Sequence, residues 1–162
     1  MDEELNPGHV GEVDPITLVG LVFETASGLD RVVSPPLERQ YELARQELEI
    51  LVRLTRTPGR RLRMSDLAAQ TNLTPSGLTR AIDRLSAAGL VSREVCPEDR
   101  RGAFAALTAA GETRMSKALD LHRAQLAELL EGVLEPDEEL AMVTVLRKLR
   151  DRVNPGASVV TP

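Results

Sequence analysis

Two groups of side chains in the middle of the chain carry hydroxyl and guanidinium groups at spacings that suit contact with a polyanion. Ser76, Thr79 and Arg80 are close in sequence, and Arg84 follows one helical turn later. Asp99-Arg100-Arg101 forms the second group. Short hydroxyls approach phosphates and base edges closely, and arginines offer paired donors to guanine or phosphate. These residue types indicate nucleic-acid recognition rather than covalent chemistry.

Side chains that would support other chemistry are few. We find no nucleophile–base arrangement, no paired carboxylates in a plausible cleft and no Gly-rich phosphate loop, so we expect no enzyme and no cofactor. His9, His122 and the single cysteine, Cys96, are far apart in sequence, which predicts no metal site. His122 falls in an apolar stripe, and we interpret it as a packed histidine satisfied by a carboxylate or carbonyl. A ligand or proton-sensor role is the alternative.

The first group must be positioned by a helix over residues 74–88. Thr74 suits the N-cap, Pro75 the first helical position, and Gly89 the left-handed residue after the last turn. The apolar residues of this segment share one narrow face: Leu78, Ala81, Ile82 and Leu85. The hydroxyls and arginines occupy the opposite face. Gly77 removes a side chain where the helix would approach DNA, and Asp83 is expected to pair with Arg80.

The elements around this helix predict a winged helix-turn-helix. A short strand is possible over residues 61–64, and Ser65 is expected to cap a brief helix over residues 66–70. Residues 90–95 and 103–107 predict two strands of a hairpin whose tip carries the second group. An arginine on such a tip, or wing, can enter the minor groove, and Asp99 can hold a neighbouring arginine in shape.

Longer helices are expected on both sides of this module. One begins at Pro15 and is stopped by Ser34-Pro35-Pro36, with a short second piece to residue 41; another runs from Thr108 to about Leu134, and the last begins at Pro136. The predicted fold class is mainly α with a small antiparallel β-hairpin, a winged helix-turn-helix with N- and C-terminal dimerisation helices. We predict a disordered leader (1–14), a dimerisation region (15–43), a DNA-binding domain (44–108), dimerisation helices (109–154) and a flexible tail (155–162).

Apolar stripes on the flanking helices exceed what a small winged module can cover. One is spaced four, three, four, three and four residues apart from Met115 to Val133, a pattern typical of helix packing. Pairing two chains would bury these stripes, so we expect a homodimer. The residues predicted at the dimer interface are Leu18, Val22, Leu29, Met115, Leu119, His122, Leu126, Leu146 and Leu149.

The charge distribution agrees with a local DNA contact. The net charge is −5, yet Arg53 to Arg101 contains ten arginines against five acidic residues, leaving ten basic and twenty acidic residues elsewhere. One cysteine excludes an intrachain disulfide, and the acidic N-terminus has neither a signal-like apolar stretch nor a membrane-length segment. We expect a cytoplasmic protein without membrane contact.

The run from Met64 to Thr108 resembles the MarR family of bacterial regulators. The matching residues are Ser65-Asp66-Leu67-Ala68, Leu78-Thr79-Arg80, Asp83-Arg84-Leu85, Gly89-Leu90-Val91, Asp99-Arg100-Arg101, Leu107-Thr108 and Gly111. The resemblance implies a triangular two-fold dimer with one helix in the major groove and Arg101 in the minor groove. Ala44 and Glu135 depart from the hydroxyl residues common at those helix starts. The residues predicted to contact DNA are Ser65, Thr74, Pro75, Ser76, Gly77, Thr79, Arg80, Arg84, Arg93, Asp99, Arg100 and Arg101.

These features predict a homodimeric regulator, a repressor, that binds a pseudo-palindromic double-stranded operator. A small-molecule effector is expected to release it. With Phe23, Tyr41 and Phe104 as the only aromatic residues, an apolar or weakly aromatic effector is favoured. Two alternatives stay open. Nearby arginines would favour a Cys96 thiolate and hence redox sensing, or the winged helix could instead bind another protein.

Overall fold

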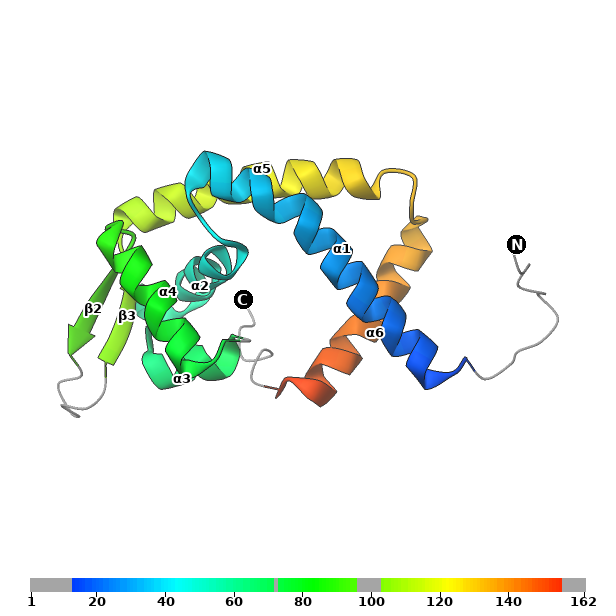
Figure 1. Ribbon diagram of the computed structural model, residues 1–162, viewed down its shortest axis with the longest axis horizontal. Helices are drawn as coiled ribbons and strands as arrows, with labels where there is room; N and C mark the ends of the chain where they lie inside the picture. Colours follow the sequence, from blue (N-terminus) through cyan, green and yellow to red (C-terminus); the bar gives the residue numbers. More distant parts are fainter. Residues whose placement is uncertain (1–12, 72, 96–102, 156–162) are drawn as a thin grey trace. The chain divides into compact units, whose positions relative to one another are not determined.

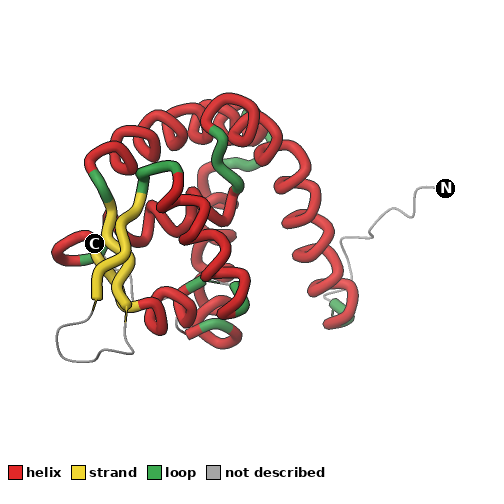
Figure 2. Tube along the Cα trace, turned by 60° about the vertical axis from the view of Figure 1, so that its left-hand side comes forward, coloured by secondary structure: helices red, strands yellow, loops and turns green. Residues whose placement is uncertain are grey.

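The computed structural model describes residues 13–71, 73–95 and 103–155. The helices are α1 (Pro15–Tyr41), α2 (Arg45–Arg56), α3 (Met64–Gln70), α4 (Pro75–Ala87), α5 (Ala109–Leu130) and α6 (Pro136–Val153), with a 3-10 turn at Pro58–Arg60. The strands are β1 (Arg61–Arg63), β2 (Val91–Val95) and β3 (Ala103–Leu107). Figures 1 and 2 show these helices and the small sheet. The predicted fold class, mainly α with a small antiparallel sheet, is confirmed.

Two compact units make up the chain, residues 1–32 and 33–162, and their boundary falls inside α1. The predicted stop at Ser34-Pro35-Pro36 is wrong, because α1 continues through both prolines to Tyr41. Proline fixes φ near the helical value, so two lost N–H donors can be tolerated where packing holds the helix. Val33 and Leu37 provide that packing, since both are buried in the second unit.

The core of the second unit is aliphatic and joins α2, α3, α4 and the sheet. From α2, Ile50, Leu51 and Leu54 have no exposed surface. They meet Leu67 of α3 and Ile82 of α4 in one buried cluster. This shared core fixes the orientation of α4, the helix that carries the first group of hydroxyls and arginines.

The sheet has the order β1-β3-β2, and both pairings are antiparallel. Leu62 of β1 lies opposite Ala105 of β3, and Val91 of β2 lies opposite Leu107. The predicted hairpin is therefore present, and the short segment before α3 adds a third strand. Ala105 is fully buried at the centre.

The predicted ends of α4 are confirmed in detail. Thr74 Oγ1 accepts a hydrogen bond from Gly77 N at 3.1 Å. At the other end, Gly89 has φ of +70°, a left-handed conformation that glycine adopts readily. Leu90 N donates to Leu85 O at 2.9 Å and Gly89 N donates to Ser86 O at 3.0 Å, which is the Schellman arrangement.

The predicted cap of α3 is wrong. The residue before the helix is Arg63, and Ser65 lies inside the first turn. Its hydroxyl donates to Asp66 Oδ1 at 3.3 Å instead of accepting from the helix backbone. The reason is that α3 begins directly where β1 ends, which leaves no turn in which Ser65 could serve as the cap.

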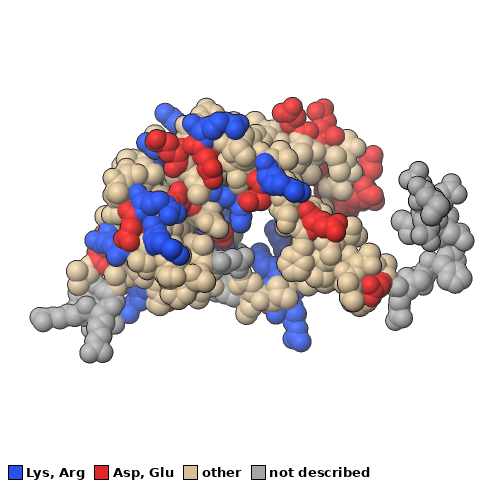
Figure 3. All heavy atoms as spheres, viewed as in Figure 1, with Lys and Arg blue, Asp and Glu red and all other residues tan. Residues whose placement is uncertain are grey.

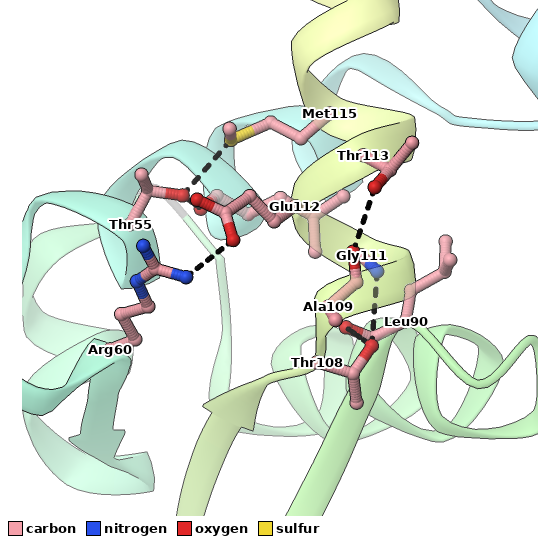
Figure 4. Close-up of polar contacts among 10 residues, drawn as sticks. Thr55, Arg60, Leu90, Thr108, Ala109, Gly111, Glu112, Thr113 and Met115 are labelled. Carbon is pink, nitrogen blue, oxygen red and sulfur yellow. Dashed lines mark hydrogen bonds and ion pairs between the residues drawn. The ribbon is translucent and has the colours of Figure 1, made fainter.

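The start of α5 is locked against the sheet (Figure 4). Thr108 Oγ1 accepts from Gly111 N at 3.0 Å and lies 3.0 Å from Leu90 O, to which it can donate. A Cβ atom at Gly111 would lie 2.1 Å from Leu90 O, so only glycine permits this approach. Further along α5, Glu112 pairs with Arg60, and Met115 accepts from the Thr55 hydroxyl at 3.1 Å.

The C-terminal end of α5 lies earlier than predicted. The helix stops at Leu130 rather than near Leu134, because Gly132 adopts φ of +69° and turns the chain toward α6. No residue of α6 is buried. Its apolar side chains are exposed, as are several in the first unit.

Candidate nucleic-acid interface

Helix α4 has one buried face and one exposed face. Leu78, Ala81, Ile82 and Leu85 are each no more than 2% exposed and anchor the helix in the core. Ser76, Thr79, Arg80, Asp83 and Arg84 are exposed on the other side. In Figure 3, basic side chains gather over α4 with acidic ones beside them. The structure thus brings together on one exposed face the residues that the sequence selected from this helix.

The first turn of α4 is preorganised by its own hydroxyl groups. Thr74 Oγ1 caps Gly77 N and lies 3.3 Å from Ser76 Oγ, while Thr79 Oγ1 donates to Pro75 O at 2.9 Å. A Cβ atom at Gly77 would lie 3.1 Å from Thr74 Oγ1. Helix N-termini favour anions because their N–H groups and dipole carry positive charge. Pro75 has no N–H group and Gly77 N is already bound to Thr74, so what this end of α4 offers a phosphate is the positive end of the helix dipole and the Ser76 side chain.

Arg84 is held by a buried carboxylate from α2. Its Nε donates to Glu47 Oε1 at 2.6 Å, and Glu47 Oε2 accepts from Ala44 N at 2.9 Å. The Glu47 side chain is only 7% exposed, whereas that of Arg84 is 60% exposed. The guanidinium group is oriented by one nitrogen and stays accessible. Glu47 was not predicted from the sequence, although a glutamate three residues after a helix start is a recognisable capping signal.

Asp83 pairs with Arg93 rather than with Arg80, which corrects the sequence-based expectation. Arg93 Nη2 lies 2.7 Å from Asp83 Oδ1 and donates to Thr79 O at 3.4 Å. The partner comes from strand β2, because the hairpin folds back alongside α4. Arg93 was predicted to contact DNA, and here it ties the wing strand to the helix.

Strand β1 adds two basic residues that the sequence analysis did not place at the interface. The guanidinium carbons of Arg61 and Arg63 lie 5.0 and 5.4 Å from the centre of the Phe104 ring. Both distances suit cation–π attraction. Arg61 also pairs with Glu94 of β2 at 3.3 Å. The alternation of arginine with apolar residues in this strand was the available signal.

The tip of the wing lies outside the described residues. Asp99, Arg100 and Arg101, and also Cys96, belong to this segment. Their predicted roles in minor-groove contact and redox sensing stay predictions.

The residues predicted at a dimer interface differ in their burial within the single chain. Met115 is 6% exposed and belongs to the core of its own chain, so its assignment to an interface is corrected. Helix spacing identified its face but not α2, the neighbour that covers it. Leu119 also packs against that core. Leu18, Leu146 and Leu149 are exposed, and Val22, Leu29, His122 and Leu126 are half-buried.

His122 differs from the packed, hydrogen-bonded histidine expected. Its Nδ1 atom is buried and has no hydrogen-bond partner within residues 13–71, 73–95 and 103–155. Burial and the positive charge of Arg45 lower the pKa of His122 below its usual 6.5. Both causes favour the neutral imidazole.

In the described ranges, no three His, Cys, Asp or Glu side chains form a group that could hold a metal ion. None of the described helices is both long and apolar enough to cross a bilayer.

An exposed helix with a capped N-terminus, a preceding short helix and a following two-stranded wing define a winged helix-turn-helix DNA-binding protein. In this class α4 is the recognition helix. Comparison with known proteins identifies the family. The MarR family model matches residues 41–102.

Two solved structures and one curated protein illustrate the similarity. Sco3205 from Streptomyces coelicolor, a MarR family transcriptional regulator solved in complex with DNA, is 30% identical; the match covers 87% of this chain and 89% of that one, with a TM-score of 0.77. AbsC from the same organism, also a MarR family regulator, is 32% identical over 83% and 93% of the two chains, with a TM-score of 0.70. The HTH-type transcriptional repressor YetL of Bacillus subtilis is 28% identical over 69% of this chain and 66% of its own. The chain belongs to the MarR family and is a DNA-binding transcriptional regulator.

Proposed function

We propose that this regulator is a homodimeric repressor that binds a pseudo-palindromic operator and is released by a small molecule. The proposal depends on one observation: the polar face of α4 is exposed, and its apolar face is buried in the core. Ser76, Thr79 and Arg80 are directed away from the core, and Arg84 is oriented by Glu47. A rigid helix with these groups suits the major groove, where arginine reads guanine and hydroxyls bind phosphate.

The remaining contacts are assigned by their place in the fold or, for the tip of the wing, by sequence pattern. Ser65, Thr74, Pro75 and Gly77 are proposed to approach the backbone around the first turn of α4. Asp99, Arg100 and Arg101 are assigned to the wing tip on the sequence pattern alone, with Arg101 in the minor groove. Arg93 supports the wing through Asp83. Repression is proposed because the similar protein YetL is named a repressor.

Homodimer formation is supported by apolar surface that the single chain leaves uncovered. On α6, the exposed apolar residues recur every three or four positions: Leu140, Val143, Leu146, Leu149 and Val153. In the first unit, Ile16, Leu18, Leu21 and Phe23 are exposed along α1. A second copy would bury such surfaces, and two recognition helices would then read half-sites about one helical turn apart.

Selection of binding sites from random duplex DNA tests the DNA-binding part. The expected product is a palindrome with half-sites about 10 base pairs apart. Affinity should fall steeply with salt, because phosphate contacts release counterions. A weak affinity with little salt dependence and no enriched sequence would favour a protein-binding module.

Sedimentation velocity tests the dimer. Leu146→Glu is expected to shift the protein toward monomer, because the charge would be buried at the proposed interface. Lys148→Glu, an exposed charge change on the same helix, should leave the association unchanged. A wild-type monomer at micromolar concentration would contradict the proposal.

A further inference from the structure

An open hollow lies where the C-terminal end of α1 meets the first half of α5, on elements other than those that carry the DNA-facing groups. Its volume is about 610 Å³. Its lining residues include Arg39, Tyr41, Glu42, Thr113, Arg114 and Lys117. Both sides of the hollow belong to the second compact unit.

The charge of this hollow is unbalanced. Arg39, Arg114 and Lys117 contribute three positive charges, and Glu42 is the one carboxylate in the lining. Figure 3 shows basic side chains over the region where the end of α1 meets α5, with acidic side chains beside them. The excess of two positive charges suits a small dianion rather than the apolar or weakly aromatic effector expected from the sequence.

Arg114 contacts two groups of its own chain, and one of them is a carboxylate that another carboxylate could replace. Its Nη1 donates to Tyr41 O at 3.2 Å and lies 3.6 Å from Glu42 Oε2. The Glu42 side chain is 86% exposed. Exposed ion pairs contribute about 0–1 kcal/mol. An external carboxylate could therefore replace that of Glu42 on Arg114 at little cost.

Glu42 also has an unusual backbone. Its φ is +53°, in the left-handed region that residues other than glycine seldom occupy. The residue after it, Leu43, is fully buried. A change in the backbone of Glu42 would therefore act on a neighbour that is fixed by burial.

The backbone that follows Glu42 is also connected to the recognition helix α4 by hydrogen bonds. Ala44 N donates to Glu47 Oε2, and Glu47 Oε1 accepts from Arg84 Nε. The hollow is therefore connected to Arg84 by the short backbone between Glu42 and Ala44 and by the buried carboxylate of Glu47. Any shift of the Ala44 N–H group changes the position of the group that orients Arg84.

We propose that this hollow binds a small organic dicarboxylate that displaces Glu42 from Arg114, and that binding weakens DNA affinity through Ala44, Glu47 and Arg84. This deepens the proposed function, since it names the chemical class of the effector. The occupied and empty states differ in the partner of Arg114. The ligand shifts the equilibrium only by its preference for the state in which Glu42 has been released.

Binding is tested without DNA. Succinate is titrated into the full-length protein and followed by backbone amide NMR shifts. Saturable shifts are expected at residues 39–44 and 110–117, with none for the neutral analogue succinamide. Arg114→Gln should weaken succinate binding at least several-fold, and Glu42→Gln should strengthen it because the internal competitor is gone. Arg123→Gln, which alters an exposed arginine of α5 paired with Asp120, is the matched control.

Several outcomes would overturn the binding site. They are the absence of saturable shifts at these residues, equal binding of succinamide, and unchanged affinity in Arg114→Gln. Inorganic phosphate is a separate arm of the titration. If phosphate binds at these residues and succinate does not, the assignment to a dicarboxylate is wrong.

Coupling is tested by measuring DNA affinity with and without succinate. We expect a several-fold loss for the wild type and no change for Glu47→Gln, which keeps the side-chain volume but weakens the hold on Arg84. The amide titration should be the same in Glu47→Gln, and circular dichroism checks its fold. A full succinate effect in this variant, or no effect in the wild type, would overturn the coupling. A protein that takes up succinate but ignores DNA would instead refute the proposed function.

Discussion

Arg93 Nη2 lies 2.7 Å from Asp83 Oδ1, so an ion pair joins strand β2 of the wing to the exposed face of the recognition helix. Both side chains are about half exposed. The pair should therefore add no more than about 1 kcal/mol to stability. Its larger effect is electrostatic, because Arg93 neutralises a carboxylate on the face proposed to meet DNA.

A double-mutant cycle separates this role from direct DNA contact. Arg93→Ala should lower operator affinity, since it leaves Asp83 uncompensated beside the phosphates. Asp83→Ala in the same chain should restore part of the loss, as measured by fluorescence anisotropy. If the double variant binds as weakly as Arg93→Ala alone, Arg93 touches DNA itself, as the sequence pattern first indicated.

Arg80 is exposed on the same face of α4. Arg80→Ala should cost about 1–3 kcal/mol of binding free energy if it reads a base, and should relax specificity at one operator position. Site selection with the variant measures both effects. Arg123→Ala serves as the control, because Arg123 is bound to Asp120 on α5. Equal losses in the two variants would remove Arg80 from base recognition.

Gly111 is required by the close contact between α5 and the start of β2. Gly111→Ala would place Cβ 2.1 Å from Leu90 O, so backbone must move. The expected cost is at least about 1–3 kcal/mol of unfolding free energy, measured by urea denaturation. Gly28→Ala adds a methyl group where nothing lies within 4 Å, and should be neutral or stabilising. Similar stability of the two variants would mean that α5 does not approach Leu90 O this closely.

Stability should depend on pH through His122. Its folded-state pKa is lowered by burial and by Arg45, so the unfolded chain binds a proton more readily. This difference in proton binding lowers the free energy of unfolding. The loss is absent above pH about 6.5 and grows as pH falls below that value, until the lower folded-state pKa is passed. Thermal unfolding of wild type and His122→Gln between pH 7.5 and 5 measures it. The variant should lose less stability on acidification, and parallel losses would assign the effect to other groups.

Local signals were sufficient wherever the deciding atoms are close in sequence. The Thr74 cap depends on Gly77 three residues away, and the stop at Gly89 depends on a backbone angle that glycine itself permits. The apolar face of α4 follows from helical periodicity. For these reasons the recognition helix, the hairpin strands and the family could be predicted from the residues alone.

Tertiary structure decided every question that depends on a distant partner. Asp83 finds Arg93 rather than Arg80, and Arg84 finds Glu47, thirty-seven positions away, only because the sheet and α2 pack against α4. Met115 has the spacing of an interface residue but is covered by α2 of its own chain. Likewise, α1 continues through Pro35 and Pro36 because Val33 and Leu37 are buried on either side. Periodicity specifies the direction of a side chain from its helix, whereas the packing of the folded chain determines what that side chain meets.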